Sequence, residues 1–307
     1  MGWTRDPRHY QIAMLATLLV YGVARLDFEI QGPQAATLLG VALLTQYACT
    51  KLWALPAFDP RSALISGLSL CLLFRTNYLE LSVLAAVVTI ASKFVIRFRS
   101  KHIFNPTNFG IVAMILLTGE VWVSPGQWGN AAFFGLLMAC LGGVVVNRAA
   151  RSDVAFTFIV SYVALVVGRS VYLGEPMTIP LHRLESGALL LFTFFMISDP
   201  KTTPNSRAGR MLFGLLVAWG AWYVQFRLFR TNGLLWSLAA FSMLVPLIDL
   251  LLPGTRYDWS RPDVGRMLPR KGDSYEENTA IRAHGHFPWG VRVVRPGAAR
   301  LLRLLRG

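Results

Sequence analysis

A basic turn that runs into an Asn-Pro pair is the first stretch of the sequence that could bind a ligand. The turn carries four basic residues, which are Arg97, Arg99, Lys101 and His102. Asn105 is a good N-cap, and Pro106 suits the first turn of a helix. A helix N-terminus offers free N–H groups and partial positive charge, so beside these side chains it would suit an anion or a phosphate. The alternative is an ordinary capped helix start with basic residues on the inner side of a membrane.

A second polar break, SDPKTTPN at residues 198–205, interrupts another apolar run. Its two prolines prevent a smooth helix, and its Thr and Asn residues offer many hydrogen-bond donors and acceptors. Asp199 and Lys201 are ionisable groups beside apolar sequence, where such groups are usually functional or paired. Lys93 and Asp249 also lie near the ends of apolar runs. For Lys93 the alternative is snorkelling to the inner surface, and for Asp249 a place near the headgroups.

Motifs of other chemistries are missing from the sequence. It contains no nucleophile elbow, paired carboxylates, P-loop or dinucleotide fingerprint, so it indicates no hydrolase or transferase site and identifies no catalytic residue. Cys49, Cys71 and Cys140 lie in separate apolar runs without CxxC spacing, and the five histidines are scattered. We therefore predict no metal site, cluster or disulfide.

The elements that position these residues are membrane helices. The chain of 307 residues is 54% hydrophobic and 15% charged, and its mean hydropathy is +0.47, whereas soluble chains are about 25% charged. Apolar blocks of roughly 15 to 21 residues indicate helices rather than strands of a barrel. The predicted fold class is all-α, a polytopic membrane protein. We expect the net charge of +14 to face anionic lipid rather than nucleic acid.

At about 20 residues per span the sequence predicts ten transmembrane helices. They begin near Tyr10, Gln34, Arg61, Tyr78, Thr107, Asn130, Asp153, Leu184, Arg210 and Gly233. The first is interpreted as a retained anchor rather than a signal peptide. With the N-terminus inside, most of the 30 Lys and Arg residues fall in cytoplasmic loops and tails, so both termini are predicted to be cytoplasmic.

An internal repeat divides the predicted membrane domain, residues 1–253. Ser66-Gly67 and Ser186-Gly187 each open a short apolar run that stops at a polar break. The two runs are spans three and eight, which point in opposite directions. We therefore predict inverted five-helix repeats over about 10–125 and 130–253, with a central site between them.

Residues 254–307 are predicted to form a basic cytoplasmic tail that binds anionic lipid. Within it, the leucines and arginines of 298–306 indicate a helix that lies on the inner membrane surface or docks on a partner.

Several of these features together resemble a known family. Lys93, then Phe104-Asn105-Pro106, then FFMISDPKTTP, then VPLID follow the order seen in RnfD and NqrB, membrane subunits of the ion-translocating ferredoxin and NADH:quinone oxidoreductases. The resemblance implies ten helices in two inverted halves, a place in the bacterial inner membrane, and transmembrane electron transfer by flavins. In that family one FMN is bound covalently through a threonine, and some members hold a second flavin noncovalently.

The sequence also departs from that family. The interval that should carry the flavin-bearing threonine, residues 121–129, contains none, so covalent FMN is not expected. Ser186-Gly187-Ala188 resembles the motif but lies elsewhere. RFRSKH replaces a glycine-rich turn, and Pro-Glu-Gly is missing at 231–234. These differences resemble stand-alone relatives, including the UnbU-like proteins of enediyne gene clusters.

Two functions are consistent with these observations. The first is a redox module with noncovalent FMN or riboflavin between the repeats and with redox partner subunits. Its predicted cofactor-binding residues are Asn105, Thr107 and Asn108 from one half, Asp199, Lys201 and Thr202 from the other, and Lys93 as charge partner. The alternative is a cofactor-free transporter or export component, or a membrane scaffold of a biosynthetic system that docks through its basic tail.

Overall fold

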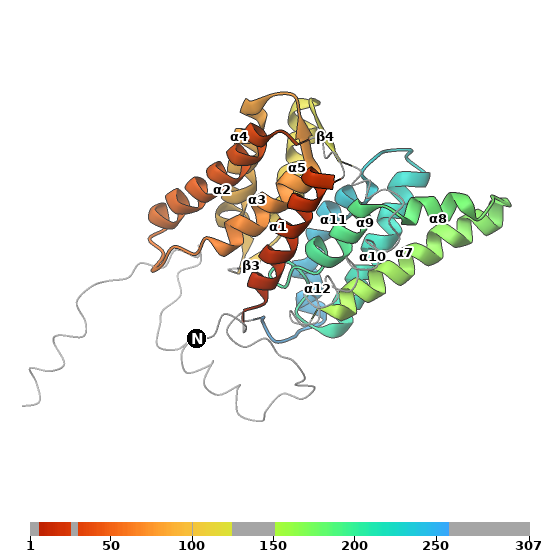
Figure 1. Ribbon diagram of the computed structural model, residues 1–307. Coiled ribbons are helices and arrows are strands. Elements are labelled where there is room, and N and C mark those ends of the chain that lie inside the picture. Colours follow the sequence, from red (N-terminus) through yellow and green to blue (C-terminus); the bar gives the residue numbers. More distant parts are fainter. Residues whose placement is uncertain (1–5, 26–29, 100, 125–150, 258–307) are drawn as a thin grey trace, which may run out of the picture. The chain divides into compact units, whose positions relative to one another are not determined.

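The computed structural model describes residues 6–25, 30–99, 101–124 and 151–257 (Figure 1). The contacts between residues divide the chain into two compact units, Met1–Val264 and Gly265–Gly307. The second unit, with the predicted amphipathic segment at 298–306, lies outside the described residues.

The described part of the chain is mostly helical, as predicted. The first five helices are α1 (Pro7–Arg25), α2 (Gly32–Leu52), α3 (Arg61–Leu73), α4 (Leu79–Val95) and α5 (Pro106–Thr118). After the undescribed 125–150 come α7 (Ser152–Leu173), α8 (Thr178–Leu184), α9 (Gly187–Leu191), the π-helix η2 (Phe192–Met196), α10 (Arg207–Phe226), α11 (Gly233–Ser242) and α12 (Val245–Leu251). Helices α3 and α11 begin at the predicted residues, Arg61 and Gly233. The helix predicted from Asn130 lies outside the described residues.

Few of these helices are both long and apolar enough to cross a membrane unaided. Among the described residues, α2 and α7 pass that test, and α11 with α12, bent by 51° at a short break, would make a third. The apolar helices α3, α5 and α9 with η2 are shorter. Ten spans and two inverted repeats therefore stay predictions.

Two short antiparallel ribbons accompany the helices, and the sequence had not indicated either. Strand β1 (Phe74–Thr76) follows α3 and pairs with β4 (Val121–Val123), which follows α5. Strands β2 (Arg97–Phe98) and β3 (Lys101–His102) form a hairpin between α4 and α5. The β1–β4 pairing gives the backbone beyond two short helices its hydrogen bonds, which an apolar environment requires.

Arg75, within β1, is almost fully buried, and its guanidinium donates to the carbonyls of Cys71 at 2.9 Å and Phe74 at 2.8 Å. It thereby satisfies carbonyl groups at the end of α3, which have no partner within the helix.

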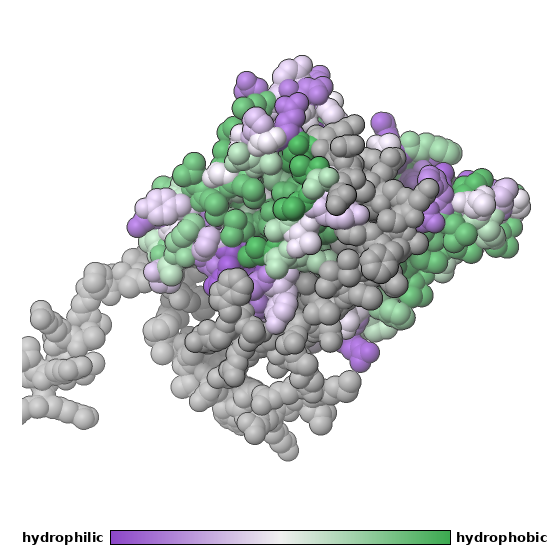
Figure 2. Space-filling view, viewed as in Figure 1, coloured by the Kyte–Doolittle hydropathy of each residue, from purple (hydrophilic) through white to green (hydrophobic). Residues whose placement is uncertain are grey.

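The sides of the helices are apolar and exposed. Figure 2 shows hydrophobic residues over the helix flanks and hydrophilic ones nearer the helix ends. Val20, Leu44, Phe156 and Tyr172 are among the large apolar residues that the fold leaves exposed. An apolar belt of this kind suits lipid contact.

Helix α5 packs against helices from both sides of the undescribed segment 125–150. It contacts α3 and α4, which precede that segment in the chain, and α11, which follows it. The contact of α4 with α5 is close at Gly110, because a Cβ there would lie only 1.8 Å from Oγ1 of Thr89. Asn108 joins α5 to α11, since its Nδ2 donates to the carbonyl of Leu235 at 3.2 Å.

Candidate functional site

The site is built around the N-terminus of α5. Asn105 caps this helix, as predicted, because its Oδ1 accepts from the backbone N–H of Asn108 at 3.1 Å, and Pro106 is the first helical residue. Asn105, Thr107 and Asn108 are all buried, and Asn108 has no exposed surface. The cap therefore holds three polar side chains inside the protein, where each needs a hydrogen-bond partner.

The loop at residues 198–205 begins where η2 ends and is organised by Asp199. Oδ1 of Asp199 accepts from the backbone N–H of Lys201 at 3.0 Å. Its carbonyl accepts from the hydroxyls of Thr202 at 3.3 Å and Thr203 at 3.1 Å. A π-helix is rare and is frequently found at functional sites, and here it delivers the chain directly to this loop.

The two elements meet through Asn105. Its Nδ2 lies 3.4 Å from Oδ2 of Asp199 and 3.4 Å from the carbonyl of Met196, both within hydrogen-bonding distance. We call the group formed by Asn105 and Asn108 of α5 with Asp199, Lys201 and Thr202 of the loop the polar site. The structure thus joins five of the seven predicted residues. Thr107 is buried on the same turn of α5 and has no hydrogen bond to the loop among the described residues.

Lys93 is near the polar site but bonds elsewhere. It is 5% exposed, and its Nζ donates to Oε1 of Gln46 at 2.8 Å and to Oγ of Ser62 at 3.0 Å. Its charge still interacts with that of Asp199. The predicted role as charge partner is consistent with this geometry, while its hydrogen bonds tie α4 to α2 and α3.

Asp199 lies in an unusual electrostatic setting for a carboxylate. Partial burial raises its pKa above the usual value, although the backbone hydrogen bond of Lys201 and the charges of Lys201, Arg151 and Lys93 oppose this. A partly buried carboxyl whose pKa is raised and which faces several cations is typical of a functional site.

Arg151 is a site neighbour that the sequence interpretation missed. In the sequence it stands out only as a basic loop residue, yet it is buried, its Nε donates to Oγ1 of Thr203 at 3.2 Å, and its guanidinium lies 4.8 Å from the ring centroid of Tyr257. The signal in the sequence was its place directly before a predicted span, next to an acidic residue at Asp153.

The basic turn before α5 does not act as four free cations. Nζ of Lys101 pairs with Oδ2 of Asp249 at 2.7 Å and donates to Oδ1 of Asn205 at 3.2 Å. Burial, together with the charges of Arg97, Lys93 and Lys201, lowers the pKa of His102 to about 4, so this imidazole is neutral at pH 7. At this helix end Lys101 is therefore paired and His102 is neutral, and the exposed cations of the turn are Arg97 and Arg99.

Two buried atoms near the polar site have no hydrogen-bond partner among the described residues: Oδ1 of Asn108 and Nδ1 of His102. An unsatisfied buried polar atom is costly, by about 1–3 kcal/mol, so it indicates a ligand or a water molecule. Oδ1 of Asn108 is a pure acceptor, and it requires a donor.

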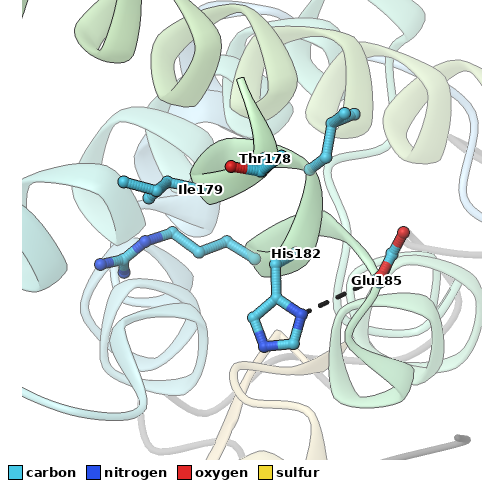
Figure 3. A pocket seen from close by; sticks show the side chains of 6 residues that line it. Thr178, Ile179, His182 and Glu185 are labelled. Atoms are coloured by element: carbon cyan, nitrogen blue, oxygen red, sulfur yellow. Dashed lines mark ion pairs between the residues drawn. The ribbon is translucent and has the colours of Figure 1, made fainter. Parts of the chain in front are cut away.

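An open hollow of about 720 Å³ lies away from this site, over α8 (Figure 3). Its lining includes Thr178, Ile179, His182 and Glu185. The pair between His182 and Glu185 spans 4.0 Å, and both side chains are largely exposed. Such a pair contributes little, so we place no function there. Within the described ranges, no three His, Cys, Asp or Glu residues come together as metal ligands.

Comparison with known proteins identifies a family that part of this chain matches. Residues 82–257 match the model of the NQR2, RnfD, RnfE family. This region starts within α4 and contains every predicted cofactor-binding residue.

Individual relatives are named as subunits of the ion-translocating oxidoreductase complex. The protein of Erwinia tasmaniensis is 30% identical over 147 residues, which is 47% of this chain and 37% of the relative. Those of Citrobacter koseri and Escherichia coli K12 are 28% identical over 136 residues, 44% of this chain and 36% of each relative. The aligned part thus spans little more than a third of each relative's length.

Proposed function

This chain belongs to the NQR2, RnfD, RnfE family, and from that premise we propose that it is an electron-transfer subunit that holds a flavin noncovalently at the polar site. The observation that carries the proposal is Oδ1 of Asn108, a fully buried acceptor without a partner among the described residues, on the first turn of α5, where this helix meets α11 and three residues after Asn105, which reaches the 198–205 loop. An isoalloxazine ring presents an imide N–H that would satisfy such an acceptor.

The donor set fits a flavin in other respects. Asn105, the N-cap of α5, adds an amide, and Thr107, buried beside the polar site on the same turn, adds a hydroxyl, while Lys201 and Thr202 add an ammonium and a hydroxyl from the loop. A bound flavin would supply one-electron and two-electron redox chemistry. The protein would contribute position, exclusion of water and the positive charges of Lys93 and Lys201, which favour added negative charge.

We also propose how the flavin is attached and to which branch of the family the chain belongs. Covalent FMN is not expected, because residues 121–129 lack a threonine. RFRSKH, where a glycine-rich turn is usual, favours the stand-alone, UnbU-like branch. We further propose redox or biosynthetic membrane partners and a cytoplasmic position for both termini.

Flavin binding is tested by the visible absorption of the purified protein and by thermal shift with added FMN or riboflavin. Thr107→Val and Thr118→Val make the same chemical change at opposite ends of α5. Loss of one hydrogen bond in a buried site weakens binding about tenfold, so we expect that loss for Thr107→Val and unchanged affinity for Thr118→Val. A colourless protein that takes up neither flavin would contradict the proposal.

One observation favours the transport alternative: the 51° bend between α11 and α12. Broken helices of this kind form substrate sites in transporters. Stabilisation by a small molecule, in a protein that binds no flavin, would support this alternative.

A further inference from the structure

The segment at residues 252–257, which follows α12, contacts the polar site without belonging to any helix or strand. It starts where the backbone N–H of Leu252 donates to the carbonyl of Ile248 at 2.8 Å and continues to Tyr257 without regular secondary structure. We call it the strap.

The strap approaches the start of α10 at Gly254. A Cβ on Gly254 would lie 2.5 Å from the backbone nitrogen of Ser206 and 2.7 Å from the carbonyl carbon of Asn205. Real Cβ atoms do not approach backbone so closely, so a residue with a side chain would push the strap away from the 198–205 loop. Gly254 therefore permits backbone-to-backbone contact at this end of the loop.

Tyr257 attaches the other end of the strap. It is 7% exposed, its ring centroid lies 4.8 Å from the guanidinium of Arg151, and its carbonyl accepts from Nζ of Lys201 at 3.4 Å. Both cations interact with the charge of Asp199. The strap thus crosses the loop from Asn205 to Lys201. It ends against residues that interact with the carboxylate of Asp199.

Most of the strap is nevertheless exposed. Residues 253–256 are exposed, and Nη2 of Arg256 donates to the carbonyl of Arg99 at the tip of the β2–β3 hairpin. A segment with exposed backbone and few buried contacts belongs to the low-stability end of a structure, where local opening occurs. The side chain of Tyr257 is the main buried group that such an opening has to release.

We propose that the strap is a cover for the polar site, closed by Tyr257 on Arg151 and Lys201, and that its release admits molecules from the aqueous side. Such a cover controls access to the polar site in the same way whether the ligand is a flavin or a transported molecule.

Access is measured by the reactivity of a cysteine placed in the polar site, next to the Lys201 that the strap contacts. Thr202→Cys introduces a thiol at a buried site residue, in a background where Cys49 and Cys140 are Ala and the buried Cys71 of α3 remains. Maleimide labelling of both thiols is followed in the purified full chain. Cys71 reports global unfolding in the same sample.

Tyr257→Ala should raise the labelling rate of the introduced cysteine at least about tenfold while that of Cys71 stays unchanged, because labelling follows the population of the open form. Tyr257→Phe is the matched control. It keeps the ring on Arg151 and should label within about twofold of the parent.

Equal labelling of the introduced cysteine in Tyr257→Ala and the parent, with Cys71 protected in both, would overturn the inference. If Cys71 also reacts in Tyr257→Ala, that variant unfolds globally, and Tyr257→Leu is measured in its place. Tyr257→Leu keeps the residue apolar and removes the aromatic ring. Faster labelling of the introduced cysteine alone then supports the cover, and an unchanged rate contradicts it. Flavin binding plays no part in these measurements, so this inference and the proposed function fail separately.

Discussion

Lys101, in the β2–β3 hairpin, forms an ion pair of 2.7 Å with Asp249 of α12, 148 residues away in the chain. The two side chains are only 12% and 17% exposed. Oδ1 of Asp249 also accepts from the backbone N–H of Asn205 at 2.7 Å, so one carboxylate joins the hairpin, α12 and the end of the 198–205 loop.

Lys101→Met should lower the free energy of unfolding by about 2–4 kcal/mol, because it leaves a largely buried carboxylate without its cation. The measurement is thermal or denaturant unfolding in detergent. Arg99→Met, at an exposed position of the same hairpin, should stay within about 0.5 kcal/mol of the parent. Lys101→Met combined with Asp249→Leu should recover part of the loss, since neither charge is then left unpaired. If Lys101→Met is as stable as the parent, this ion pair does not stabilise the fold.

Gly110→Ala tests the close contact of α4 with α5. The added Cβ would lie 1.8 Å from Oγ1 and 3.2 Å from Cα of Thr89, so the helices must move apart. We expect a loss of about 1–3 kcal/mol in unfolding free energy. The control is Gly40→Ala in α2, where a Cβ meets no atom within 4 Å and where Ala favours the helix. Equal effects of the two substitutions would contradict the close packing.

His102 should make stability depend on pH between about 6.5 and 4. Burial lowers its pKa to about 4 in the folded chain, whereas the unfolded value is about 6.5. In this window the unfolded state binds the additional proton, so stability falls as the pH falls, by up to about 2–3 kcal/mol. Melting temperatures of the parent and His102→Gln at pH 7, 6 and 5 measure this effect. The melting temperature of His102→Gln should depend less steeply on pH than that of the parent. Parallel curves for the two proteins would contradict this role of His102.

Asp59 should make stability depend on pH in a lower range than His102 does. It belongs to an ion-pair cluster with Asp6, Arg8 and Arg61, in which Arg8 lies 2.6 Å and Arg61 2.8 Å from its carboxylate. Although partial burial raises its pKa, the hydrogen bond of Arg61 and the charge of Arg8 prevail and lower it to about 2.

Because the folded pKa of Asp59 is depressed, its contribution is present above the unfolded value of about 4 and is lost as the pH falls to about 2. The side chain is 35% exposed, so solvent screening limits the effect to about 1 kcal/mol. Denaturant unfolding at pH 5, 4 and 3 should show a smaller acid loss for Asp59→Asn than for the parent. A larger loss in the variant would refute the assignment.

The sequence alone determined the features that depend on short stretches of chain. Composition indicated a helical membrane protein, and Asn105 with Pro106 indicated the start of α5, because capping involves residues only three positions apart. The break at 198–205 and Lys93 near the end of an apolar run were also visible, since charges and prolines in apolar runs are local signals. The ten spans, the inverted repeats and the orientation stay predictions.

Only the tertiary structure decided which of these features meet. It placed Asn105 against Asp199 and Lys101 against Asp249, buried Arg151 and removed the charge of His102. It also laid residues 252–257 across the loop. These relationships join residues up to 148 positions apart, and they depend on how helices pack and exclude water, which no short window of sequence encodes.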